Sequence, residues 1–316
     1  MKKNLFFISV AALALGACTS DNVVEENNSV KQPKEIAIQA ITTPNTRAAV
    51  TGTSFPEIPM KVAAYDVTLD RDLFGATTFS KDATTWKGGK YWPFATTTIN
   101  FLAIANANSD NATGVTWGVT DANYASKVVV AMADNRTAQR DLMYAIGTGN
   151  NSSSFPTIPM EFKHAQAWVK FNVKAGNTTS ATAITVNSIT LNSVSCQGTY
   201  TVTQTNFDQA TGQVAAGAWS DYASNAGNVT LAPSFTLSTS GADFGDLMVV
   251  PNQGMASFTI NYTIDGKTYD YTYSTSSTAL AQATKYTYNI TLTVHEIEVA
   301  PTVADWTEGG PVAINL

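Results

Sequence analysis

Cys18 is the residue of this chain best placed for covalent chemistry. It ends the stretch Leu15-Gly16-Ala17-Cys18, which follows two lysines and a short apolar run. This order of basic, apolar and small residues predicts a signal peptide over residues 1–17. The small residues give a signal peptidase access to the backbone, and the Cys18 thiol takes a lipid such as palmitate. The alternative is an ordinary secretory signal with a chance cysteine.

The composition of the chain argues against several classes of function. Only 13% of the residues are charged, the net charge is −6 and no basic patch appears, so nucleic acid is an unsuitable partner. Cys196 is the one cysteine besides Cys18, which excludes a disulfide framework and predicts a small buried side chain. Beyond the signal no apolar run has the length of a membrane span, so we expect membrane attachment through the lipid alone.

Catalytic and metal-binding patterns are missing from the sequence. His164 and His295 stand far apart, and no Cys/His cluster has the spacing of a zinc site. The carboxylate pairs Asp70/Asp72 and Asp243/Asp246 fit solvated turns better than a glycosidase. We therefore expect no enzyme activity, no metal and no cofactor.

The elements that surround Cys18 begin with a polar, acidic tether, which is followed by a short strand from Glu35 to Ile41. Alternation along this strand places Ile36, Ile38 and Ala40 on one face. A loop-like stretch then leads to Arg47, which is followed by Ala48. Residues 18–47 thus form a leader between the signal and the main body of the chain.

The rest of the chain is dominated by short alternating strands, which predict an all-β fold of sandwich type. Asp265-Gly266 between two such strands is a hairpin turn signal. Helical periodicity is best from Thr137 to Ile146. The aromatic residues Trp86, Tyr91 and Trp92 suit stacking on a sugar, but packing in a core is the preferred interpretation. Core packing is likewise preferred for three tyrosines that share one strand face, namely Tyr269, Tyr271 and Tyr273.

A short internal similarity suggests where the chain divides. The segment Phe55-Pro56-Glu57-Ile58-Pro59-Met60 returns as Phe155-Pro156-Thr157-Ile158-Pro159-Met160, directly after a linker-like run. Chance similarity of two loops is an equally good interpretation. If each copy opens a domain, residues 48–155 form the first sandwich and residues 156–316 the second.

Several distinctive segments follow one another along the chain. They are Trp86-Lys87-Gly88-Gly89-Lys90-Tyr91-Trp92-Pro93, Asp141-Leu142-Met143-Tyr144-Ala145, Met160-Glu161-Phe162-Lys163-His164-Ala165, Met248-Val249-Val250-Pro251-Asn252-Gln253, Lys285-Tyr286-Thr287-Tyr288-Asn289-Ile290 and Asp305-Trp306. In this order, and behind a lipoprotein signal, they resemble the Bacteroidales fimbrillins over nearly the whole chain.

This resemblance implies two transthyretin-like, Greek-key β-sandwich domains in tandem and a subunit of a type V pilus. Such precursors travel as lipoproteins to the outer membrane. An arginine-specific protease then cuts them after an arginine and releases the lipid together with the first strand. A strand from another pilus subunit fills the vacated place, and the polymer supports adhesion and biofilm formation at the cell surface.

Applied to this sequence, the resemblance makes Arg47-Ala48 the processing site and Ile36, Ile38 and Ala40 the core-facing residues of the released strand. The C-terminal tail is a candidate donor because its apolar residues Val312, Ile314 and Leu316 alternate. The same pattern fits an edge strand of the tail's own domain.

Two other functions compete with that of a stalk subunit. One is a pilus tip adhesin that binds a host or bacterial surface ligand and needs no donor tail. The other is a lipid-anchored surface protein that binds a glycan or protein and never polymerises. For this last function, cleavage at Arg47 would be irrelevant.

Overall fold

A computed structural model describes residues 33–42, 55, 57–106, 115–118, 127–132, 141–151, 155–176, 183–203, 207–208, 213–214, 217–223, 226–251, 253–275, 279–293, 297–305 and 312–313. These residues form strands and turns without an α-helix, which confirms the predicted all-β class. Within the described part, therefore, no helix could cross a bilayer. The signal peptide, Cys18, Arg47, Ala48, Ile314 and Leu316 lie outside the described residues.

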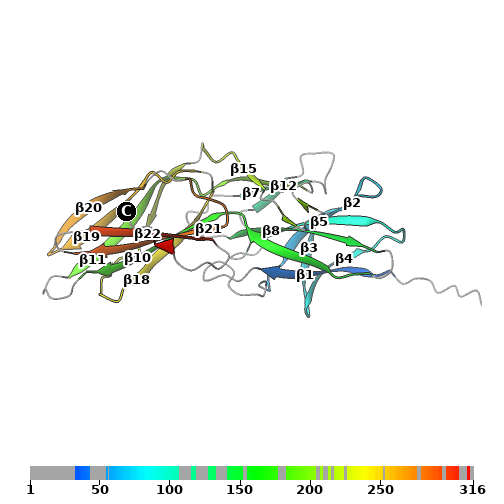
Figure 1. Cartoon of the computed structure of the whole chain (residues 1–316), viewed down its shortest axis with the longest axis horizontal. Coiled ribbons are helices and arrows are strands. Elements are labelled where there is room, and N and C mark those ends of the chain that lie inside the picture. Colours follow the sequence, from blue (N-terminus) through cyan, green and yellow to red (C-terminus); the bar gives the residue numbers. More distant parts are fainter. Residues whose placement is uncertain are drawn as a thin grey trace, which may run out of the picture. The chain divides into compact units, whose positions relative to one another are not determined.

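Seven strands of the N-terminal half close into a barrel (Figure 1). All neighbouring pairs are antiparallel except the closing pair, in which β1 and β9 run parallel. In barrel order the strands are β1 (Glu35–Thr42), β4 (Thr85–Tyr91), β3 (Arg71–Asp82), β2 (Met60–Asp66), β5 (Thr98–Asn106), β8 (Leu142–Asn150) and β9 (Ile158–His164).

The C-terminal half is a sandwich of two sheets around one apolar core. Phe171 of one sheet and Phe258 of the other meet in this core with their ring centroids 5.0 Å apart. The first sheet contains β18 (Ala242–Val249), β10 (Ala167–Ala175), β21 (Thr284–Leu292), β22 (Ile297–Asp305) and β23 (Val312–Ala313). The second contains β16 (Gly227–Leu231), β11 (Ile184–Val194), β19 (Ser257–Ile264) and β20 (Lys267–Ser274), with β17 (Phe235–Thr236) paired to β11.

A third sheet joins strands from the two halves of the sequence. Its central pair is β7 (Lys127–Met132) with β12 (Gly198–Thr203), and its outer strands are β6 (Val115–Gly118) and β15 (Ala218–Ser220). Tyr200 and Val202 of β12 belong to a buried cluster with Leu102, Ile104 and Tyr144 from β5 and β8. This sheet therefore buries the outer face of barrel strands whose inner face already lines the barrel core. A separate short pair is formed by β13 (Phe207–Asp208) and β14 (Gln213–Val214).

Burial on both faces explains why the helical periodicity noted from Thr137 to Ile146 does not give a helix over residues 142–146. Residues 142–146 lie in β8, where Met143 and Ala145 face the barrel core while Leu142, Tyr144 and Ile146 face the other cluster. A strand buried on both sides is a continuous apolar run, and such a run cannot be told from a buried helix by periodicity alone.

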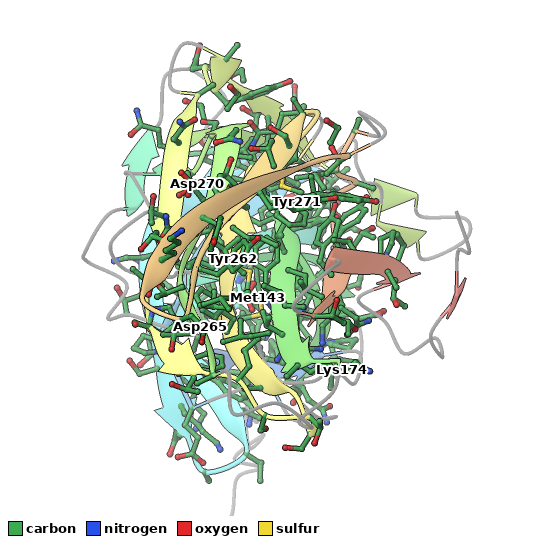
Figure 2. The ribbon with its side chains drawn as sticks, turned by 90° about the vertical axis from the view of Figure 1, so that its left-hand side faces the viewer. Met143, Lys174, Tyr262, Asp265, Asp270 and Tyr271 are labelled. Carbon is green, nitrogen blue, oxygen red and sulfur yellow. The ribbon has the colours of Figure 1, made fainter. Side chains whose placement is uncertain are left out.

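The hairpin predicted at Asp265-Gly266 is present between β19 and β20 (Figure 2). Both turn residues have positive φ, 49° for Asp265 and 71° for Gly266, as a two-residue turn of this hand requires. Tyr271 and Tyr273 pack at the edge of the sandwich core, whereas Tyr269 stays exposed and stacks on Tyr262. Cys196 is buried, as predicted.

The two copies of the Phe-Pro motif precede β2 and β9, both of which belong to the barrel. The second copy leads into β9, which pairs with β1 and β8 inside the barrel, and the sandwich core begins at Ala167. The domain limits set near residue 155 remain a prediction.

Candidate functional site: the first strand and its slot

Strand β1 is hydrogen-bonded on both sides. It lies antiparallel to β4, with Ile38 opposite Trp86, and parallel to β9, with Ile38 opposite Ile158 and Ala40 opposite Met160. It therefore closes the barrel, and without it β4 and β9 would both present unpaired backbone groups. We call the place between β4 and β9 the β1 slot.

The three apolar residues predicted to share a face of this strand all point into the barrel core. Ile36 and Ile38 are 0% exposed and Ala40 is 7% exposed, while Gln39 and Ile41 on the other face of the strand are exposed. Burying each isoleucine contributes roughly 1.5–3 kcal/mol. The strand thus contributes directly to barrel stability, and its loss would uncover apolar surface along the whole slot.

Aromatic side chains surround the buried face of β1. Phe55, Trp86 and Phe162 belong to the same core cluster as Ile36 and Ile38. The ring of Phe55 meets Trp86 edge-on at 5.4 Å and Phe162 at 4.3 Å between centroids. Trp86 also donates its indole N–H to the carbonyl of Ile58 at 3.0 Å. The lining of the slot is therefore fixed by contacts that do not involve β1.

Polar contacts hold the start of β1. The carbonyl of Lys34 accepts a hydrogen bond from the Trp92 amide at 3.0 Å, and the Glu35 carboxylate accepts one from the Gly89 amide at 2.9 Å. A β-bulge between Glu35 and Ala37 shifts the register against β4. These bonds are exposed or lie at a strand end, so they contribute less to holding the strand than the buried isoleucines.

Gly149 is a residue of this region whose role the sequence does not reveal. A Cβ at this position would lie 2.2 Å from Ile158 Cδ1 and 2.8 Å from a ring carbon of Trp92. The absence of a side chain at Gly149 leaves room for the side chains of Ile158 and Trp92, and Ile158 lies opposite Ile38. A glycine inside an apolar strand pattern indicates a close contact in the sequence, but it does not reveal that the contacting residues are Ile158 and Trp92.

Two of the three aromatic residues weighed as a sugar platform are core residues. Trp86 and Trp92 are each 3% exposed in the barrel, as the preferred interpretation predicted. Tyr91 is 52% exposed, so its predicted core position is wrong. It sits at the last position of β4, where its side chain points away from the core.

The C-terminal tail pairs with its own domain over the two positions that the structure describes. In β23, Val312 lies opposite Val303 and Ala313 opposite Thr302 of β22. This is the edge-strand arrangement that the sequence left open beside donation.

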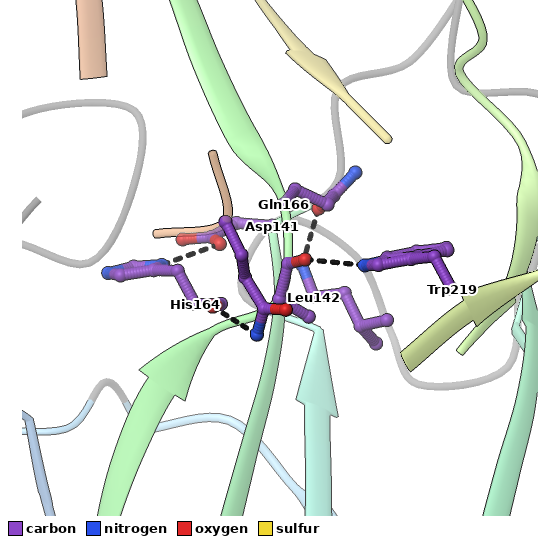
Figure 3. A network of polar contacts seen from close by, with 7 residues as sticks. Asp141, Leu142, His164, Gln166 and Trp219 are labelled. Atoms are coloured by element: carbon purple, nitrogen blue, oxygen red, sulfur yellow. Dashed lines mark hydrogen bonds and ion pairs between the residues drawn. The ribbon is translucent and has the colours of Figure 1, made fainter. Parts of the chain in front are cut away.

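A buried polar network lies where the barrel strands lead into the sandwich (Figure 3). His164 Nδ1 and Asp141 Oδ1 are 2.8 Å apart, and the Gln166 side chain accepts the Leu142 amide at 2.8 Å. Trp219 donates its indole N–H to the Ala165 carbonyl at 2.6 Å. Nearby, the Tyr200 hydroxyl accepts from the Gly217 amide and from Gln282, and burial raises the pKa of Tyr200 above its ordinary value. These hydrogen bonds join the ends of β8 and β9 to the residues that follow them, so we assign the network a structural role.

Nothing in the described ranges brings together three or more His, Cys, Asp or Glu side chains in a way that could hold a metal ion. The β1 slot holds its strand through main-chain pairing with β4 and β9 and through burial of alternate side chains, the two features by which a sheet edge recognises a strand.

Comparison with known proteins places the chain in a family. Residues 22–306 match the model of the fimbrillin-like family. The fold is similar to that of a candidate cell adhesion protein from Bacteroides uniformis, with a TM-score of 0.53 and 18% identity over 86% of this chain and 98% of that one. It is also similar to a fimbrial protein from Bacteroides vulgatus, with a TM-score of 0.50 and 14% identity over 86% and 99% of the two chains. A comparison with curated protein sequences gives no significant match.

The chain belongs to the fimbrillin-like family, because the family model covers most of its length. Membership makes it a structural subunit of the pilus and cell-adhesion type, located at the cell surface, with other pilus subunits as partners. At these sequence identities the solved structures show the shared fold alone.

Proposed function

We propose that the chain is the precursor of a pilus subunit that polymerises by exchanging its first strand. In this scheme the precursor carries a lipid on Cys18 and is held at the outer membrane. An arginine-specific protease cuts between Arg47 and Ala48 and releases the lipid, the tether and β1 together. A strand from another subunit then enters the β1 slot, and the resulting fimbria supports adhesion and biofilm formation.

One observation carries the proposal: the strand that completes the barrel core stands on the leader side of Arg47. Ile36 and Ile38 are fully buried, yet the chain between β1 and β2 contains the proposed cutting site. Cleavage alone does not remove a strand bonded on both sides. A competing strand with a similar apolar pattern would replace it while keeping the slot covered, which avoids an aggregation-prone edge.

The candidate donor is the tail that contains Val312, Ile314 and Leu316, whose alternation matches that of Ile36, Ile38 and Ala40. Residues 309–311 before it, Gly309-Gly310-Pro311, provide a hinge. For donation, the tail would give up the pairs that Val312 and Ala313 form with β22 and gain β4 and β9 as partners on the two sides of the slot.

Replacing Arg47 tests the processing step. We expect Arg47→Ala to leave an uncut, lipidated precursor that forms no polymer, because β1 stays covalently joined to the barrel. Arg71→Ala is the matched control, since Arg71 is exposed at the start of β3. N-terminal sequencing of surface protein and polymer ladders on gels are the measurements. Polymer formation by uncut Arg47→Ala protein would contradict the proposal, and retention of all adhesive function without polymer would favour the lipid-anchored binder.

A pilus tip adhesin is the second candidate, and the pairing of β23 with β22 favours it because the tail then stays in its own domain. Deletion of residues 307–316 separates the two roles. A stalk subunit loses its polymer ladder on deletion, whereas a tip subunit is still incorporated at the end of a pilus built from other subunits.

A further inference from the structure

Exposed apolar side chains gather at one end of the barrel. The described part of the chain has seven large hydrophobic residues that are exposed, and five of them come from three loops or loop edges of the barrel. Phe94 is 74% exposed, the highest value of the seven. The five residues, which we call the apolar end, are Val67, Leu69, Tyr91, Phe94 and Phe155.

Strand pairing brings these loops together. β2 ends where β5 begins, with Asp66 opposite Ile99, and β8 ends there too, with Asn150 opposite Thr98. β4 ends where β1 begins, with Tyr91 opposite Glu35. The turns after β2, β4 and β8 therefore share the end of the barrel at which β1 starts. The opposite end carries the chain onward from β9 into the sandwich.

Hydrogen bonds fix the backbone of these loops. The Asn151 side chain accepts the Thr97 amide at 2.9 Å and donates to the carbonyls of Pro93 and Ala95. In the β2–β3 turn, buried Asp66 accepts the amides of Thr68 and Leu69 at 3.1 and 3.0 Å. A surface held in one conformation loses little entropy on binding, and exposed apolar patches mark interaction sites. The apolar end therefore has the properties of a protein-binding surface.

We propose that the apolar end docks the body of a second fimbrillin-type subunit, namely the one whose strand fills the β1 slot. The inference rests on the proposed strand exchange. The residue before β1, Lys34, lies beside Trp92, two positions before Phe94. If a donor strand enters the slot in the direction of β1, the part of the donor chain that precedes this strand also lies there. When the donor strand is the C-terminal tail, the part that precedes it is the C-terminal sandwich of the donor subunit. Only residues 306–311 separate β22 from β23, an extended reach of about 20 Å.

A membrane surface fits the apolar end less well. The tether from Cys18 to Pro33 has an extended reach of about 50 Å, so a lipid on Cys18 does not press the barrel against the bilayer. Leu69 is followed by Asp70, Arg71 and Asp72, so carboxylates outnumber cations in this stretch and give an anionic lipid surface no net attraction. A short link between donor strand and donor body, in contrast, holds that body at the slot.

The experiment combines a double substitution with photo-cross-linking in the full-length chain. Leu69→Ser with Phe94→Ser removes the two most protruding aliphatic and aromatic groups, and Tyr269→Ser, on the exposed hairpin of the sandwich, is the matched control. We expect the double variant to fold and to be cut normally, but to polymerise about tenfold more slowly. A loss of this size is typical when residues at the centre of an interface are truncated. The control should polymerise like the unmodified chain.

A photoreactive phenylalanine analogue at position 94 identifies the occupant. A cross-link to another subunit in assembled polymer supports the inference. A cross-link to phospholipid alone, no cross-link in polymer, or normal polymerisation of the double variant overturns it. Failure of the unmodified chain to polymerise after cleavage overturns the proposed strand exchange itself, and the inference with it.

Discussion

The N-terminal barrel and the C-terminal sandwich complete their cores in different ways. The sandwich core is made by strands that all follow Ala167, among them the β19–β20 hairpin joined by a two-residue turn. The barrel core includes Ile36, Ile38 and Ala40 from β1, which is separated from the rest of the barrel by the stretch that contains Arg47. One cut in that stretch would therefore leave the sandwich whole and make the barrel dependent on a strand that is no longer part of its chain.

The largest expected effect comes from placing a charge in the β1 slot. Ile38→Asp buries a carboxylate without a partner and should destabilise the barrel by at least about 4 kcal/mol. Hydrogen exchange should show lost protection in β4 and β9 while β10 and β21 of the sandwich stay protected. Gln39→Asp, which adds the same charge at an exposed neighbour, is the control. Equal loss of protection in both halves would show that the two cores do not differ in this way.

A smaller change tests whether β1 contributes only before cleavage. Ile38→Ala should cost the uncut chain about 2–5 kcal/mol through lost burial and the cavity it leaves, and should cost nothing once the leader is released. Ile260→Ala, at a fully buried position of the sandwich, should cost a similar amount before and after cleavage. Urea unfolding of cut and uncut protein measures both. If Ile38→Ala still lowers the free energy of unfolding of the cut, polymerised protein, then β1 has stayed in its slot.

The smallest expected effect concerns the region where the two halves meet. Tyr200→Phe removes a hydroxyl that accepts hydrogen bonds from the Gly217 amide and Gln282, and should cost about 1–2 kcal/mol. Burial raises the pKa of Tyr200 in the folded state above its ordinary value of 10.0. Its contribution to stability is therefore fully present below about pH 10 and is lost as the pH rises further. The variant should show a weaker alkaline loss of stability than the unmodified chain, with exposed Tyr269→Phe as the control.

Local sequence patterns predicted the elements whose causes are local. Alternation placed Ile36, Ile38 and Ala40 on one face of a strand, and Asp265-Gly266 predicted its hairpin, because side-chain period and turn geometry act over a few residues. The resemblance in segment order predicted the family, which the match over residues 22–306 confirms. Cleavage at Arg47, lipidation of Cys18 and strand donation remain predictions.

Patterns failed where burial depends on distant parts of the chain. Residues 142–146 suggested a helix because β8 is apolar on both faces, a consequence of the sheet that contains β12 covering the barrel. Tyr91 was expected in the core with its neighbours Trp86 and Trp92, but the end of β4 leaves it in solvent. Neither outcome is encoded within a window of a few residues.

The sequence by itself determined the all-β class of the chain and the apolar strand face formed by Ile36, Ile38 and Ala40. Only the tertiary structure decided that this strand closes a barrel, between β4 on one side and a parallel β9 on the other. The physical reason is that strand pairing is chosen by packing. The place of Ile38 depends on Trp86, on Ile158 and on Gly149, which leaves room for the Ile158 side chain, and these residues come together only when the barrel closes.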